Sequence, residues 1–296
     1  MRILLDSRDL INLLEHGRPI APEEYDTYLG ACAHLNVLSF TNIRELVAPL
    51  ASGAEFMNIR PMLQALEKMP HTYLSEVPII GSEIRSAVHS FEMDTEYEPP
   101  NIYTTRWDHV LVSAPGQSRS AADNWVNLCL DEIVYLIRRV NPEVFAPPKH
   151  HIPAFQRLLE QDRDNLRAGH APARLHFVRS ITKHANTHQV QLPNGSELEF
   201  AQWVYQNPNR CPGLRLHHET YRALMTNYAD VPEVGDFSDL AHICALPYVE
   251  AATFDRRMRH YCEVASRKLI KLGCSVNYRD RVYQDLGTVI QANPCP

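Results

Sequence analysis

Acidic residues stand at the ends of apolar stretches in two distant parts of the sequence. Asp6 ends the run ILLD, and Asp255 directly follows the run AATF. Glu45 lies shortly after a third apolar run, VLSF, and Asp239 precedes AATF with Asp236 one helical turn earlier. Carboxylates in close contact raise one another's pKa, so a cluster of them stays ionised only when a cation compensates the charge. Oxygen ligands select Mg²⁺ or Mn²⁺, and such an ion can polarise a phosphodiester and activate water.

The elements expected around these acids alternate between strand and helix. Apolar runs predict short strands at 2–6, 36–40 and 248–254, and apolar residues at helical spacing predict helices at 7–17, 23–35, 41–51, 236–246 and 256–273. This order predicts an α/β fold with a parallel sheet. Sites in open parallel sheets form outside the carboxyl ends of the strands, so acids from different elements can meet at one rim.

The middle of the chain lacks this alternation. The acidic, proline-bearing stretch 92–101 predicts an exposed loop, and apolar spacing predicts a helix at 120–142 that begins at Ser120 and Asp123, a pair resembling a capping box. Alternating residues around Asn194-Gly195 predict a β-hairpin at 187–205. We therefore expect a core domain of residues 1–70 and 228–296, interrupted by an insertion, 71–227, of helices plus a β-hairpin.

The composition is that of a globular chain without a global excess of positive charge. The 296 residues are 45% hydrophobic and 22% charged, and the net charge is −6. Nucleic-acid binding would therefore depend on a local patch of cations. Seven irregularly spaced cysteines without a C-x-x-C argue against a disulfide framework or a zinc ribbon and favour a reducing cytoplasm. We expect neither a signal peptide nor a membrane span.

The ordered acidic motifs resemble those of the PIN-domain nuclease family. The segments LLDSRDLINLL, TNIRELV and DFSDLAHICALPYVEAATFDRR follow one another in that family's order and cover roughly half of the chain. The resemblance implies a three-layer α/β/α sandwich and metal-dependent cleavage of RNA. It implies that Asp6, Glu45, Asp239 and Asp255 are the catalytic, metal-holding acids. Thr253 matches the small hydroxyl residue that often lies two positions before the last aspartate.

The same acids also have structural interpretations. Asp6 can cap the following helix, and for Asp236, the weaker metal candidate, we prefer the role of an N-terminal cap. Glu45 can be a solvated surface acid. Asp255 is the hardest to explain in this way, because no turn glycine follows its strand.

Polar neighbours of the acids could support the site. Ser7 and Thr253 can hold a carboxylate by hydrogen bonds. His242, three residues after Asp239, can orient a carboxylate, although a satisfied structural histidine is the preferred interpretation. Arg256 and Arg257 can bind phosphate or form a solvated helix start.

One local basic segment, 165–196, contains no acid. Its Arg174, Arg179 and Lys183 can follow a nucleic-acid backbone, because phosphate neutralisation needs clustered cations; an ordinary solvated loop and hairpin is the alternative. His184 and His188 lie four residues apart, but the flanking residues indicate loop or strand. We therefore do not predict a zinc site there.

These patterns lead to the prediction of a Mg²⁺- or Mn²⁺-dependent nuclease, an endoribonuclease in preference to a DNA-directed nuclease of a bacterial defence or toxin–antitoxin system. The insertion would select the substrate. A catalytically silent PIN-like scaffold that binds nucleic acid or protein is the alternative from another class. The resemblance makes a second copy of the chain and an inhibitory protein candidate partners, with no association with membranes expected.

Overall fold

The computed structural model describes residues 1–74, 79–107, 128–140, 152–167, 173–227, 229–230, 233 and 235–295. The helix expected at 120–142 is described only in its later part, as helix α8 (Leu130–Val140), and the expected capping pair Ser120 and Asp123 lies outside the described residues.

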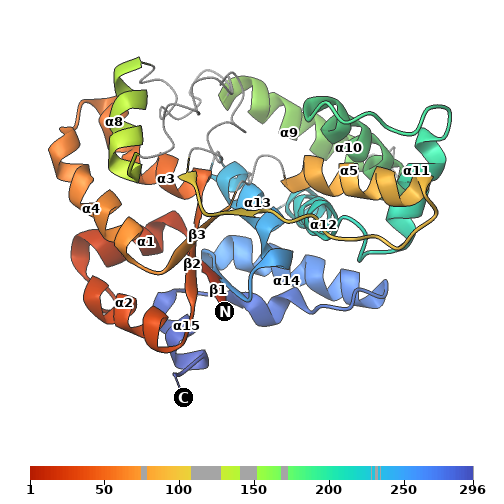
Figure 1. The fold of residues 1–296 in the computed structure, drawn as a ribbon. Coiled ribbons are helices and arrows are strands. Elements are labelled where there is room, and N and C mark those ends of the chain that lie inside the picture. Colours follow the sequence, from red (N-terminus) through yellow and green to blue (C-terminus); the bar gives the residue numbers. More distant parts are fainter. Residues whose placement is uncertain are drawn as a thin grey trace.

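A six-stranded sheet forms the centre of the described fold. Its strands are β1 (Arg2–Leu4), β2 (Leu35–Ser39), β3 (His71–Leu74), β4 (Tyr103–Thr104), β5 (Ala251–Thr253) and β6 (Val282–Tyr283). They lie in the order β4-β3-β2-β1-β5-β6, and all neighbours pair in parallel except β3 and β4. The carboxyl ends of five strands therefore meet at one edge, and helices lie on both sides of the sheet (Figure 1).

Each face of the sheet carries its own apolar core, because successive strand residues point to opposite faces. Leu4 and Val37, which pair in register, belong to the first core, here called core A; Ile3 and Leu38 belong to the second, core B. Core A contains residues of α5 (Ile79–Glu92), α10 (Ala173–Thr187), α11 (Glu197–Gln206), α12 (Pro212–Thr226), α13 (Asp236–Ala245) and α14 (Arg256–Lys271). Core B contains residues of α1 (Ser7–His16), α2 (Pro22–Ala31), α3 (Phe40–Val47), α4 (Phe56–Lys68), α8 and α15 (Leu286–Ala292).

The remaining elements are peripheral to these cores. Helix α9 (Ile152–Arg167) lies against α12, and 3₁₀ turns occupy Ala48–Ser52, Leu246–Tyr248 and Tyr278–Arg281. The arrangement is α/β and compatible with a three-layer α/β/α fold.

The predicted β-hairpin at 187–205 is wrong. A turn does form at Gly195, whose φ of 77° favours glycine, but it leads into α11 rather than into a second strand. Phe200, Ala201 and Val204 are buried together on one face of that helix, so the spacing that reaches core A is helical.

The segment 71–227 also contributes to the sheet. Strand β3 begins at residue 71, directly after the expected end of the core domain, and pairs in parallel with β2. Helices α5, α10, α11 and α12 share core A with β1, β2 and β5, so this segment buries one face of the sheet.

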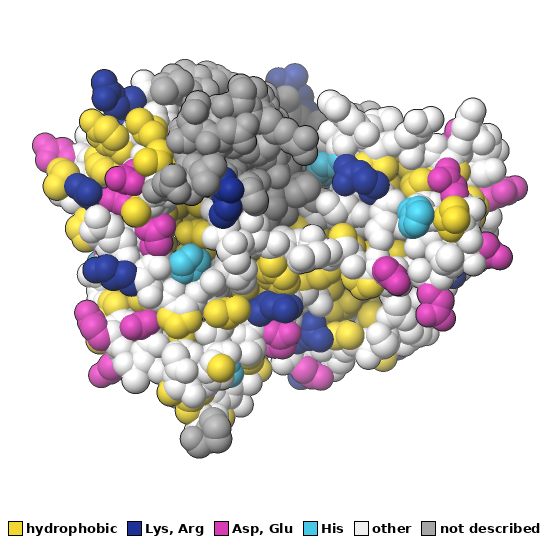
Figure 2. Space-filling model, in the orientation of Figure 1, with side chains coloured by type: hydrophobic (Ala, Val, Ile, Leu, Met, Phe, Trp, Pro, Cys, Tyr) yellow, Lys and Arg dark blue, Asp and Glu magenta, His cyan; other side chains and the backbone are white. Residues whose placement is uncertain are grey.

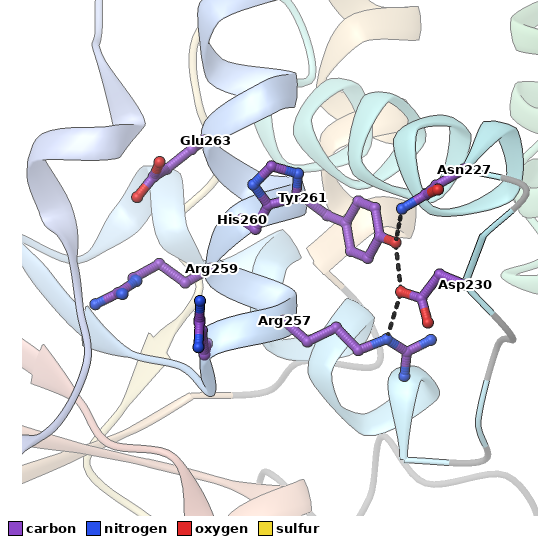
Figure 3. Close-up of a pocket in the computed structure, with 8 residues that line it drawn as sticks. Asn227, Asp230, Arg257, Arg259, His260, Tyr261 and Glu263 are labelled. Carbon is purple, nitrogen blue, oxygen red and sulfur yellow. Dashed lines mark hydrogen bonds and ion pairs between the residues drawn. The ribbon is translucent and has the colours of Figure 1, made fainter.

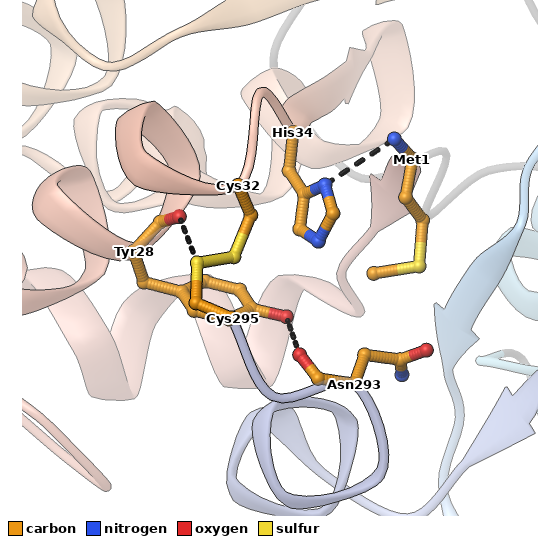
Figure 4. The surroundings of a disulfide bond; sticks show 6 residues. All are labelled: Met1, Tyr28, Cys32, His34, Asn293 and Cys295. Carbon is orange, nitrogen blue, oxygen red and sulfur yellow. Dashed lines mark hydrogen bonds between the residues drawn. A yellow bond between two sulfur atoms is a disulfide. The ribbon is translucent and has the colours of Figure 1, made fainter.

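Cys32 and Cys295 form a disulfide, which the sequence had not led us to expect. Their Cα atoms are 5.4 Å apart, and the bond ties the end of the described chain to the end of α2 (Figure 4). The Tyr28 hydroxyl donates to the Asn293 carbonyl at 2.8 Å beside it. The other five cysteines, all among the described residues, form no disulfide. None of the helices in the described ranges is long and apolar enough to cross a membrane.

A buried carboxylate joins α5 to α12. Glu83 of α5 is fully buried and accepts hydrogen bonds from the backbone N–H groups of Gly213 and Leu214, at 2.7 and 2.8 Å, and from the Tyr248 hydroxyl at 2.7 Å. The first two donors belong to the unpaired N–H groups of the first turn of α12. A Cβ added at Gly213 would lie 2.5 Å from the Cys244 carbonyl oxygen, so only glycine fits there. Burial raises the pKa of Glu83 to about 7, although these three hydrogen bonds lower it.

We expect Glu83→Ala to destabilise the protein by about 3 kcal/mol or more, because it leaves two buried N–H donors and the half-buried Tyr248 hydroxyl unpaired, at about 1–3 kcal/mol each. Urea denaturation at pH 7 measures the change. Glu92→Ala, at an exposed position of the same helix, is the matched control and should change the free energy of unfolding by less than about 0.5 kcal/mol. Equal stability of the two variants would contradict the role given to Glu83.

Candidate active site at the carboxyl edge of the sheet

Three expected acids are carried to the carboxyl edge of the sheet by the strands and helices around them. Asp6 follows β1 and is the N-cap of α1, and Asp255 follows β5 and is the N-cap of α14. Glu45 lies in α3, which begins directly after β2. All three side chains are half-buried.

Asp239 joins them from the first turn of α13, a helix that precedes β5 in the chain. It too is half-buried, and its charge interacts with those of Asp6 and Asp255. Asp6 in turn interacts with Glu45. The four acids expected from the sequence thus belong to one electrostatic cluster, which we call the rim cluster.

Ionisation of the rim cluster is unfavourable, as the raised pKa values of two of its acids indicate. Burial raises the pKa of Asp239 from 3.8 to about 7; repulsion by Asp6, Asp255 and Asp236 adds to this, and His242 opposes it. Burial also raises the pKa of Asp6, an effect that His242 and Arg8 reduce and that repulsion by Glu45 increases. The described protein therefore supplies less positive charge than these carboxylates need.

A hydrogen-bond network fixes the backbone under these acids. The Asp6 N–H donates to Thr253 Oγ1 at 2.8 Å, which joins the ends of β1 and β5. Asn42 donates from Nδ2 to the Leu5 carbonyl at 2.9 Å and to Ser7 Oγ at 3.3 Å, which joins β1 to α3. Thr253 and Ser7 were expected to support carboxylates. Thr253 does support a carboxylate, that of Asp9, through a side-chain hydrogen bond. Ser7 instead accepts from Asn42.

His242 is a buried histidine with a defined partner. Its Nε2 lies 3.1 Å from Ser39 Oγ, and Ser39 and Asn42 form the capping box that begins α3. The side chain is 2% exposed. His242 thus connects α13 to the end of β2, in line with the preferred structural interpretation, and its charge also acts on Asp6 and Asp239.

Asp6 and Asp255 also act as helix caps. The Asp255 carboxylate accepts from the Met258 N–H at 2.6 Å, and that of Asp6 accepts from the Arg8 N–H at 3.5 Å. Asp255 was the acid we found hardest to explain structurally, and its cap supplies such an explanation. Capping fixes where each carboxylate lies without neutralising it fully.

Two acids at the same edge were missed. Asp9, in the first turn of α1, is 5% exposed; burial raises its pKa, its hydrogen bond with Thr253 lowers it, and its Oδ2 is buried without a hydrogen-bond partner among the described residues. Asp285 follows β6 as the N-cap of α15, and its charge acts on Asp9. Asp9 and Asp285 line a cavity of about 600 Å³ between α1 and α15. The capping pattern D-L-G-T at 285–288 was the available sequence signal.

Arg257 is already engaged by acids. Its guanidinium lies 2.8 Å from Asp230 (Figure 3) and 2.8 Å from Asp236. The carboxylate of Asp236 also accepts from the Glu233 N–H at 2.6 Å. Asp236 therefore acts in an ion pair at the start of α13. Arg257 fastens the loop before α13 to the start of α14, where the sequence suggested a phosphate ligand.

Arg256 is placed differently. It is exposed and lines a cavity of about 470 Å³ with Arg259 and His260, on the turn of α14 that follows Asp255 (Figure 3). Arg256 directly follows Asp255 of the rim cluster in the chain, so it can meet an anion bound there.

The other expected nucleic-acid ligands lie on α10, far along the chain from the acids. Arg179 and Lys183 are exposed, and the side chain of Arg174 lies outside the described residues. On the face that Figure 2 shows, positive and negative side chains are interspersed over the described surface rather than gathered into a basic patch.

The donor set of the rim cluster fits a hard cation. Its members offer carboxylate oxygens, the ligands that Mg²⁺ and Mn²⁺ prefer, and a cation would relieve the repulsion that raises the pKa of Asp239. Within the described ranges, however, only Glu67, Cys129 and Asp131 form a trio of ligating side chains whose donor atoms all lie within 4.8 Å of one another. Side chains of the rim cluster would therefore have to rotate to share one ion.

The trio near α8 is occupied by protein groups. Asp131 pairs with Arg60 at 2.8 Å and accepts from Gln64 at 3.0 Å, while Glu67 accepts from the Leu130 N–H at 3.0 Å. These contacts already stabilise its carboxylates, so we assign it no metal.

Comparison with known proteins found no match among protein-family models, curated proteins or solved structures. We therefore infer function from the residues of this chain.

We expect Asp239→Asn to stabilise the metal-free protein at pH 8 and not at pH 4. The folded protein keeps the Asp239 proton up to about pH 7, whereas the unfolded chain loses it near pH 3.8, so stability falls as the pH rises through this window. Asparagine removes that cost, which should raise the Tm by about 2 °C or more at pH 8. Thermal unfolding in EDTA measures it.

The exposed Asp26 supplies the control, because Asp26→Asn should not change the Tm at either pH. An Asp239→Asn protein that is no more stable than the wild type at pH 8 would contradict the raised pKa of Asp239.

Proposed function

We propose that the chain is a Mg²⁺- or Mn²⁺-dependent nuclease of the PIN-like type, acting on RNA in preference to DNA. The observation that carries the proposal is the rim cluster: Asp6, Glu45, Asp239 and Asp255 come from four separate elements and interact through their charges at one edge of a parallel sheet. The parallel order β3-β2-β1-β5-β6 also supports it, because this order brings the ends of β1, β2 and β5 side by side. The preference for RNA comes from the resemblance in the acidic motifs.

Each group of residues would have a separate role in hydrolysis. Asp6, Glu45, Asp239 and Asp255 would hold one or two ions, and a bound ion would supply Lewis-acid polarisation of the phosphodiester. The carboxyl group of Asp239, with its pKa near 7, would release its proton as the ion binds. Arg256 and Arg259 would hold a phosphate beside the cluster, and the buried His242 would keep α13 against the end of β2.

A silent scaffold is the second candidate, favoured by one observation. No three carboxylates of the rim cluster have ligand atoms within 4.8 Å of one another in the described structure, so a closed ion site would require movement. Binding of RNA without turnover in the presence of Mn²⁺ would support the scaffold.

We expect Asp6→Asn and Asp255→Asn each to reduce metal-dependent cleavage by about 100-fold or more without loss of stability. Asparagine is as good an N-cap as aspartate, so the substitution removes charge while the caps of α1 and α14 remain. Cleavage of labelled single-stranded RNA, tRNA, single-stranded DNA and duplex DNA, with Mg²⁺, Mn²⁺ or EDTA, measures the effect and the substrate preference. Undiminished cleavage by both variants, with Asp26→Asn as the control, would reject the site.

We expect Arg256→Ala to weaken RNA binding and to reduce the salt dependence of the binding constant by the equivalent of about one phosphate contact. Fluorescence anisotropy in EDTA, at several KCl concentrations, measures both quantities. Arg257→Ala should instead lower the Tm, because it leaves Asp230 and Asp236 without their cation. Arg267, exposed farther along the same helix, is the control, and an equal effect of Arg267→Ala would argue against the cavity as a phosphate subsite.

A further inference from the structure

Three histidines from two helices gather on the core A side of the sheet. His184 lies in α10, and His188 follows the end of that helix in the same helical path, since its N–H donates to the His184 carbonyl at 2.9 Å. His217 faces them from α12. The expectation of loop or strand around His184 and His188 was wrong, and their spacing of four residues therefore places both rings on one helical face.

The rings are close together. The centroids of His184 and His188 are 6.2 Å apart with nearly parallel planes, and those of His184 and His217 are 5.7 Å apart, edge to face. Gly81 of α5 makes room for this arrangement, because a Cβ at that position would lie 2.7 Å from the Cβ and 2.8 Å from the Cγ of His188. Any other residue at position 81 would displace the ring.

The ring nitrogens are available as ligands. No hydrogen bond of the His184, His188 or His217 ring occurs among the described residues, and His217 Nδ1 is buried without a partner. Buried polar atoms without a partner are rare in folded proteins and call for an explanation. Burial lowers the pKa of His184 to about 3 and that of His217 to about 4, so both rings are neutral at pH 7, the form that binds metals.

We propose that His184, His188 and His217 form a Zn²⁺ site that joins α10 to α12. Imidazole ligands suit Zn²⁺ and similar divalent transition metals, whereas the carboxylates of the rim cluster suit Mg²⁺ and Mn²⁺. Three protein ligands leave one position of a tetrahedral ion open to solvent. The ring nitrogens do not all lie within 4.8 Å of one another, so binding requires the half-buried rings to rotate toward a common point. This site is independent of the proposed nuclease function.

The surroundings allow a cation to enter. Lys183 and Arg85 are the positive side chains whose charges act on these rings, and both are exposed, so solvent screens them. A second histidine pair, His176 and His218, has ring centroids 5.0 Å apart, and His176 stacks with Tyr221 of α12. This pair provides a comparison within the same region.

The test is Zn²⁺ binding by the full, untagged protein, measured by competition with a chromophoric chelator. We expect one ion per chain with a Kd of about 1 μM or tighter. His184→Ala and His217→Ala should each weaken binding by about 100-fold or more, since even loss of an outer-sphere partner costs about 10–100-fold. Co²⁺ should give the visible absorption of a tetrahedral site in the wild type and lose it in both variants.

Matched variants separate this site from the others. His89→Ala, at an exposed position of α5, and His176→Ala should leave Zn²⁺ affinity unchanged, as should Cys129→Ala in the trio near α8. Asp6→Asn should also retain Zn²⁺, which keeps this result distinct from the fate of the nuclease proposal. Should His184→Ala fail to fold, His188→Gln at the edge of the site replaces it. Absence of stoichiometric Zn²⁺, or binding that only Cys129→Ala removes, would overturn the proposal.

Discussion

Burial of negative charge at the carboxyl edge of the parallel sheet is the constraint on which the candidate active site depends. The parallel strands β1 and β5 end side by side, so the residues that follow them, Asp6 and Asp255, have to lie near one another. Both are held by backbone hydrogen bonds at the start of a helix, and neither can turn away without losing its cap. Burial is the main cause of the raised pKa of Asp239, and the repulsion that adds to it is a consequence of topology, since it follows from where strands end and helices begin.

Glu83, in contrast, is a buried carboxylate whose hydrogen bonds are supplied by the protein itself. Two backbone N–H groups of α12 and the Tyr248 hydroxyl surround Glu83, so each oxygen has a donor. The rim cluster lacks such a set, because no hydrogen bond or ion pair of the Asp239 side chain occurs among the described residues. Asp9, which lies beside the cluster, also keeps a buried oxygen without a hydrogen-bond partner there. Hydrogen-bond donors of the protein satisfy the Glu83 carboxylate, whereas the charge of the rim cluster is left to be compensated by a cation from solution.

The sequence predicted what depends on local pattern and missed what depends on distant contacts. The strand ends before Asp6 and Asp255 follow from short apolar runs, and the edge at which they meet follows from the alternation of strand and helix. Asn194-Gly195 is an equally local turn signal, yet the residues after it form α11 because core A accepts a helical face at Phe200, Ala201 and Val204. Strand β6 spans only Val282–Tyr283, too short for a pattern.

The roles of the cations and histidines could not be predicted from the sequence either, because they also depend on distant contacts. Arg257 pairs with Asp230, and the distance in sequence hides that contact. His184 and His188 gain a common face only because Phe177 and Ile181 bury α10 in core A. Residue types in the sequence therefore indicated which side chains could bind a ligand or take part in catalysis. Packing determined which of them are placed to do so.

Helices of the segment 71–227 pack in core A against α13, the helix that carries Asp239. Leu240 and Ile243 of α13 are buried in the same core as Ile84 of α5 and Leu214 of α12. Asp239 lies on α13, so the packing of these helices determines how deeply its carboxyl group is buried, and burial is the main cause of its raised pKa. A disturbance of α5 or α12, such as one at Glu83, would therefore reach the rim cluster through the position of α13. The segment that interrupts the acidic motifs in sequence thus helps to set the charge state of the acid that lies after it.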